Sequence, residues 1–155
     1  MESNLDSKCL DQAIRFLSRR EYSRAELRTK LRRTHPVEII DAVLDELQHR
    51  RLLDDQRYAA EYARMAATRK KVTPHRALAD LLRNGVSRQT AESAVQSVYG
   101  SADTPALARQ LAAKHLPRLR NLPSAVARRR LAGVLARRGF DQDVVASLMD
   151  ELLPS

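Results

Sequence analysis

The stretch LLRNGVSRQTAESAV, residues 81–95, has a counterpart in LARRGFDQDVVASLM, residues 135–149. Each has a leucine, a glycine four residues later, an apolar residue and then a residue that commonly caps helices. A glycine followed by a capping residue is typical of a turn between two helices. LRRTHPVEIIDAVL, residues 31–44, fits the same frame with one residue fewer and with His35 in place of glycine. These copies predict an internal repeat of about 50 residues.

Apolar residues at helical spacing predict three helices in each repeat. In the first helix these positions are Leu10, Ile14 and Leu17, and Ser23 with Glu26 forms a capping box before the second. Nine helices are expected, over residues 9–20, 24–33, 37–53, 54–71, 74–84, 88–99, 104–119, 124–138 and 141–153.

We therefore expect an all-α fold of three tandem three-helix repeats, residues 1–53, 54–100 and 101–155. A unit of this size buries little apolar surface alone, so stacking on its neighbours should contribute to its stability. The composition agrees, because the chain has only four glycines, no tryptophan and 4% aromatic residues.

Composition also limits the location and the partners. A single cysteine, Cys9, excludes a disulfide framework and suits a reducing cytosol. No secretory signal or long apolar run is visible, so we expect a cytoplasmic, monomeric protein without a membrane partner. The net charge of +9 and the pI of about 10.4 indicate attraction to polyanions.

The positive charge is unevenly distributed. Residues 1–53 carry 11 basic and 9 acidic groups, residues 54–100 carry 8 and 5, and residues 101–155 carry 9 and 5. The middle helix of a repeat is basic and the helix after it is acidic, which internal pairing could explain in part. The candidates for contact with nucleic acid or an acidic protein surface are Arg19, Arg20, Arg24, Arg28, Arg32, Arg33, Lys70, Lys71, Arg128, Arg129, Arg130, Arg137 and Arg138.

The residues do not predict an enzyme, a metal site or a cofactor. The glycines are too scattered for a phosphate loop, and the histidines have no ligand partner at helical spacing. Asp54 and Asp55 are helix caps or, as the alternative, ligands of a hard cation. Cys9 is a core thiol or, less simply, a catalytic one. Tyr58 and Tyr62 either pack against a helix or stack on unpaired bases.

Three motifs resemble the RecX regulatory proteins of bacteria: SRREYSRAELRTKL (18–31), LLDDQRYAAEYAR (52–64) and RRGFDQDVVASLMDEL (137–152). The similarity covers roughly residues 8 to 153, in the order and at the spacing of the family. This sequence departs from the family at His35–Pro36, where a glycine and an aromatic residue are usual, and at Thr73, where a glycine is common.

The resemblance implies tandem three-helix repeats in an elongated, curved, right-to-left array. It also implies a regulator of RecA that docks in the groove of the RecA–single-stranded DNA filament. Proteins of the family inhibit RecA's ATP hydrolysis, strand exchange and LexA cleavage, in DNA repair, recombination and the SOS response. Several also bind DNA, so single-stranded and double-stranded DNA are both candidate partners.

Two other hypotheses remain open. The charge alone is compatible with a general DNA-binding helical module that acts without RecA and loses affinity steeply with salt. A helical adaptor for another acidic protein is the third hypothesis. Charge reversal at Arg128, Arg129 and Arg130 should weaken the first two functions and could spare the third.

Overall fold

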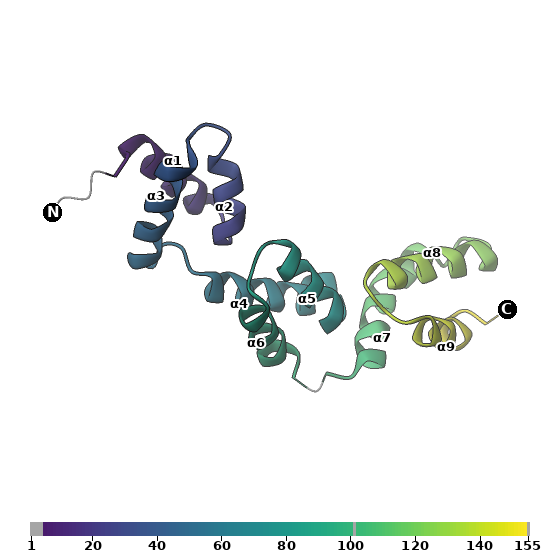
Figure 1. Cartoon of the computed structure of the whole chain (residues 1–155). Helices are drawn as coiled ribbons and strands as arrows, with labels where there is room; N and C mark the ends of the chain where they lie inside the picture. The colour runs from purple at the N-terminus through teal and green to yellow at the C-terminus, as the bar shows by residue number, and fades with distance from the viewer. Residues whose placement is uncertain (1–4, 101, 155) are drawn as a thin grey trace. The chain divides into compact units, whose positions relative to one another are not determined.

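The computed structural model describes residues 5–100 and 102–154, and their secondary structure is entirely helical (Figure 1). The predicted all-α fold is confirmed, and a helix begins within two residues of each predicted start. The helices are α1 (Ser7–Arg19), α2 (Arg24–Leu31), α3 (Val37–His49), α4 (Asp55–Met65), α5 (Pro74–Arg83), α6 (Arg88–Tyr99), α7 (Thr104–His115), α8 (Ser124–Arg137) and α9 (Gln142–Leu152). A π-helix, η1 (Ala66–Lys70), extends α4, and a 3-10 turn, η2 (Leu116–Arg118), follows α7.

Local capping chemistry fixes several helix starts. The Ser23 hydroxyl accepts a hydrogen bond from the backbone N–H of Glu26 at 3.0 Å, and the Glu26 carboxylate accepts one from the N–H of Ser23 at 3.1 Å. The predicted capping box is therefore confirmed. Asp54 caps α4 by accepting from the N–H of Gln56 at 2.9 Å. Asp55 has another role, because its carboxylate accepts from the N–H of Arg24 at 2.8 Å.

Apolar stripes of the helices form two main cores. One lies among α1, α2 and α3 and includes Leu27, Leu31 and Leu44, and the other lies among α7, α8 and α9. Cys9 is fully buried in the first core, as expected of a core thiol. Ile14 differs from the expected pattern, since it is 37% exposed, whereas Ala13 beside it is buried.

The chain divides into two compact units. The N-terminal unit comprises the residues up to Tyr62 together with Asp80–Ala94, and the C-terminal unit comprises Ala63–Ala79 together with the residues from Val95 on. The three repeats with boundaries after residues 53 and 100 stay a prediction.

A glycine turn joins elements distant in sequence within the N-terminal unit. Gly85, between α5 and α6, has a φ of +84°, and a Cβ there would overlap the Cβ of Ala25 on α2. Beside it the buried Ser23 hydroxyl donates to the Asn84 carbonyl at 2.6 Å, and the Asn84 side chain donates to the Tyr58 hydroxyl at 2.9 Å. The turn therefore packs directly against the start of α2.

The C-terminal unit also contains a glycine turn that packs against an element distant in sequence. Gly139, between α8 and α9, has a φ of +97°, and a Cβ there would lie 2.5 Å from the Thr73 hydroxyl before α5. The N–H of Thr73 donates to the Arg138 carbonyl at 3.1 Å. The similarity of the two glycine turns in the sequence thus corresponds to a similar packing role.

Candidate polyanion-binding site

The basic stripe of α2 is mostly engaged with α3. Arg24 forms an ion pair with Asp45 at 2.9 Å and donates to the Gln48 side chain. Arg28 binds Asp41 at 3.0 Å, and this hydrogen bond lowers the pKa of the Asp41 carboxyl. The alternation of basic and acidic helices thus reflects internal pairing at these two arginines. Arg32, the third member of the stripe, is exposed and has no side-chain partner among the described residues.

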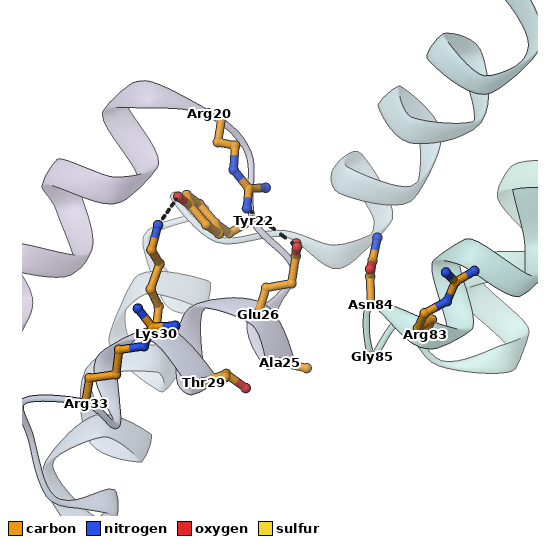
Figure 2. A pocket seen from close by; sticks show the side chains of 10 residues that line it. All are labelled: Arg20, Tyr22, Ala25, Glu26, Thr29, Lys30, Arg33, Arg83, Asn84 and Gly85. Carbon is orange, nitrogen blue, oxygen red and sulfur yellow. Dashed lines mark hydrogen bonds and ion pairs between the residues drawn. The ribbon is translucent and has the colours of Figure 1, made fainter. Parts of the chain in front are cut away.

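A hollow of about 340 Å³ lies in the N-terminal unit, between the α1–α2 segment and the turn after α5. Figure 2 shows the side chains that line it. We call it the N-terminal hollow. Four cations and one carboxylate are among its lining residues, which are Arg20, Tyr22, Ala25, Glu26, Thr29, Lys30, Arg33, Arg83, Asn84 and Gly85.

Three of the four cations of the N-terminal hollow have partners in the fold. Arg20 lies 3.6 Å from the ring centroid of Tyr22 and 3.5 Å from the Glu26 carboxylate. Lys30 donates to the Tyr22 hydroxyl at 3.1 Å (Figure 2), and Arg83 pairs with the buried Asp80. Arg33 alone lacks a side-chain partner in the described part of the chain. Arg20 and Lys30 therefore stabilise the α1–α2 segment, and Arg83 forms an ion pair within α5.

The tyrosines pack within the fold. Burial raises the pKa of Tyr22, but the hydrogen bond from Lys30 and the charge of Arg20 bring it below its ordinary value overall. Tyr58 is buried and stacks on Tyr62 with centroids 6.4 Å apart, and Tyr62 donates to Asp80 at 2.6 Å. Helix packing, not an exposed platform for bases, is thus their role in this structure.

Three other candidates also contact their own chain. Arg128 on α8 pairs with Asp150 at 3.0 Å and donates to the carbonyls of Met149 and Leu153 at the end of α9. Arg138 donates to the Lys70 carbonyl, and Lys71 donates to the Gln110 side chain at 3.2 Å. Arg128 therefore caps α9, which gives the first of the three consecutive arginines, Arg128 to Arg130, a structural role.

A second hollow, of about 430 Å³, lies in the C-terminal unit between the end of α7, η2 and one face of α8. We call it the C-terminal hollow. Its lining contains four arginines and no carboxylate: His115, Arg118, Leu119, Arg129, Arg130, Gly133, Val134 and Arg137. The four arginines are exposed, and none has a hydrogen-bond or ion-pair partner among the residues that the structure describes. Mutual repulsion disfavours such a cluster unless an anion neutralises it.

The positive charge around the C-terminal hollow affects the pKa of His115. Burial lowers its pKa below the ordinary value, and the charges of Arg138, Arg118 and Lys114 lower it further. The imidazole is therefore biased toward its neutral form until an anion approaches.

The structure brings together only part of the predicted set. Arg129, Arg130 and Arg137 share the C-terminal hollow, whereas Arg20 and Arg33 line the N-terminal one. The exposed Arg19 lines neither, and Lys70 contributes its carbonyl to Arg138. Sequence reasoning missed Arg118 and His115, although the basic segment KHLPRLR (114–120) could have indicated them.

Residues 5–100 and 102–154 contain no group of three or more potential metal ligands. No helix in that part of the chain is long and apolar enough to cross a membrane.

Comparisons with known proteins agree on one family. Residues 9–47 match the model of the first three-helix domain of RecX, and residues 103–149 match that of the third. The chain is 30% identical to the regulatory protein RecX of Chlorobium phaeobacteroides, over 97% of each chain. It is 34% identical to that of Thermobifida fusca, over 90% of this chain and 76% of the relative.

Solved structures show the same fold. The crystal structure of RecX from Lactobacillus salivarius aligns with a TM-score of 0.68 at 24% identity, over 94% of this chain and 95% of that one. Another RecX crystal structure aligns with a TM-score of 0.71, over 93% of this chain and 72% of that one. On the evidence of the domain matches and of the relatives at 30% identity or more, this chain belongs to the RecX family of regulatory proteins.

Proposed function

We propose that this protein regulates RecA by docking on the RecA–single-stranded DNA filament. In this proposal it inhibits the ATPase, strand-exchange and coprotease activities of RecA in the cytoplasm, and it does so as a monomer without catalysis of its own. The observation that carries the proposal is the family membership, which extends over nearly the whole chain. The exposed arginines of the C-terminal hollow support it, since a filament that contains DNA presents phosphates.

The contact residues are best chosen among the cations that the fold leaves free. Arginines engaged with α3, α9 or Tyr22 could reach a partner only by giving up those contacts. Six of the thirteen candidates are exposed and have no side-chain hydrogen-bond or ion-pair partner among the described residues, and they remain our proposed contacts: Arg19, Arg32, Arg33, Arg129, Arg130 and Arg137. Contacts on both units would reinforce one another, because linked weak contacts gain from effective concentration.

A general DNA-binding module is the second candidate function, favoured by the net charge of +9. In that case the protein would bind single-stranded or double-stranded DNA directly, and this binding would not require RecA. It would act by covering the DNA.

The single-stranded-DNA-dependent ATPase of the cognate RecA separates the two functions when it is titrated with this protein. We expect inhibition when the molecules of this protein are far fewer than the RecA protomers, because a regulator needs to occupy only a few positions on a filament. Inhibition only when the DNA is fully covered would support the DNA-binding module instead, and no inhibition would refute the proposal.

A further inference from the structure

We propose that the C-terminal hollow is a binding site for the phosphate backbone of single-stranded nucleic acid, with Gly133 as its floor. The inference rests on the proposed function, because it names the component of the filament that this face of the protein contacts.

The arrangement of charge in the hollow suits a polymer of anions. Arg129, Arg130 and Arg137 lie on one face of α8, and the first and last are eight positions apart, so their backbone positions span about 12 Å along the helix. Arg118 approaches the same hollow from η2. A single protein carboxylate would neutralise one of these four guanidinium groups, whereas consecutive phosphates of a strand can neutralise several.

The uncharged part of the lining bears on the sequence preference of the hollow. Leu119 and Val134 provide apolar surface between the cations, and His115 is the one aromatic ring in the lining, which contains no Phe, Tyr or Trp side chain. Without a large aromatic platform, the hollow offers its four guanidinium groups mainly to phosphates, and contacts with phosphates carry no direct sequence information. We therefore expect binding with little sequence preference.

Gly133 supports the anion site independently of the arrangement of charges. It lies in the middle of α8, where glycine destabilises a helix by roughly 0.5–1 kcal/mol relative to alanine. Its φ is not positive, and the three atoms nearest to an added Cβ all belong to the Arg137 guanidinium, the closest being a nitrogen at 3.1 Å. Neither backbone conformation nor core packing thus requires a glycine. Its lack of a side chain instead leaves room for the Arg137 guanidinium, and for a phosphate, close to the helix.

The experiment measures the affinity for a fluorescently labelled single-stranded oligonucleotide, without RecA, at several salt concentrations. The test variant is Arg129→Ala with Arg130→Ala and Arg137→Ala. The control, Arg15→Ala with Arg64→Ala and Arg69→Ala, removes the same charge from three exposed arginines that lie outside the hollow and lack a side-chain partner among the described residues. Circular dichroism verifies that both variants are helical, which alanine favours.

The test variant should lose about a hundredfold in affinity at 0.1 M salt, and its salt slope should fall by about 2, since each phosphate contact on a single strand contributes about 0.7 to the slope. Gly133→Ala should weaken binding several-fold while the protein melts at a higher temperature. Unlabelled oligonucleotide should compete far better than polyglutamate.

Equal losses in the test and control variants would overturn the inference, as would equal competition by polyglutamate. Because this assay contains no RecA, its failure is distinguishable from failure of the proposed function, which is tested by inhibition of the RecA ATPase with the unmodified protein.

Discussion

The N-terminal and C-terminal hollows each collect four cations, but they use them differently. In the N-terminal hollow, Arg20, Lys30 and Arg83 are held by an aromatic ring, a hydroxyl or a carboxylate. In the C-terminal hollow the four arginines have no such partner in the described residues, and the neighbouring charges lower the pKa of His115. A count of basic residues would rate the two hollows alike. Only the partners show that one cluster stabilises the fold and the other is available to an external anion.

Substitution by alanine should change the free energy of unfolding in opposite directions at Gly85, in the N-terminal hollow, and Gly133, in the C-terminal one. The larger effect is expected at Gly85. Gly85→Ala forces a side chain onto a positive φ and into Ala25, so we expect a loss of roughly 2–5 kcal/mol in the free energy of unfolding. Gly100→Ala is the control, because its φ is also positive but nothing lies within 4 Å of the added Cβ. Chemical denaturation measures both. Equal losses would contradict the close packing of the α5–α6 turn on α2.

Glu26 tests whether the N-terminal hollow is structural. Glu26→Ala removes both its capping bond to the N–H of Ser23 and its ion pair with Arg20, so we expect the free energy of unfolding to fall by about 1 kcal/mol. Glu92→Ala, which breaks only an exposed pair with Arg88, should cost less than about 0.5 kcal/mol. Thermal or urea denaturation of the two variants makes the comparison, and an equal loss would argue against the structural role.

Gly133→Ala should stabilise the protein by roughly 0.5–1 kcal/mol, because α8 gains a better helix former and only the flexible Arg137 side chain has to move. Urea denaturation measures this gain. A loss of stability would mean that Gly133 has a packing role and would remove its assignment as the floor of an anion site.

The smallest expected effect concerns His115. Its pKa is lowered in the folded state, so the unfolded chain takes up a proton more readily, and stability should fall as the pH drops through the ordinary value of 6.5. Melting temperatures at pH 7.5 and pH 5.5 measure the fall, which His115→Gln should reduce. Saturating oligonucleotide should also reduce it, because phosphates offset the cations that disfavour protonation. An unchanged pH dependence in His115→Gln would show that other groups cause it.

The helices and turns were predictable because residues close together in the sequence determine where each helix begins and ends. The Ser23–Glu26 capping box, the Gly85 and Gly139 turns and the core leucines of α2 follow from short-range spacing, and the structure confirms them. The exposure of Ile14 did not follow, because helical spacing alone does not say which of two adjacent apolar stripes faces the core.

The candidate site was only partly predictable because its members depend on tertiary partners. Arg24 and Arg129 look alike in the sequence, yet Arg24 meets Asp45, 21 positions away, and Arg129 meets no acidic group in the described part of the chain. Arg118 joins the hollow only because η2 turns the chain toward α8. Pairs and clusters of this kind are set by how helices pack, which composition and periodicity do not specify.

The measurement that tests the central claim most directly is RecA ATPase inhibition by two matched arginine doublets. Arg129→Ala with Arg130→Ala alters the C-terminal hollow, and Arg32→Ala with Arg33→Ala alters another exposed pair, on the N-terminal unit. We predict that the unmodified protein inhibits at far fewer molecules than RecA protomers. The C-terminal doublet should raise the concentration for half-inhibition by about tenfold or more, since two phosphate contacts are lost, and the N-terminal doublet should raise it less. Inhibition that is unaffected by the C-terminal doublet, or absent from the unmodified protein, would contradict the account.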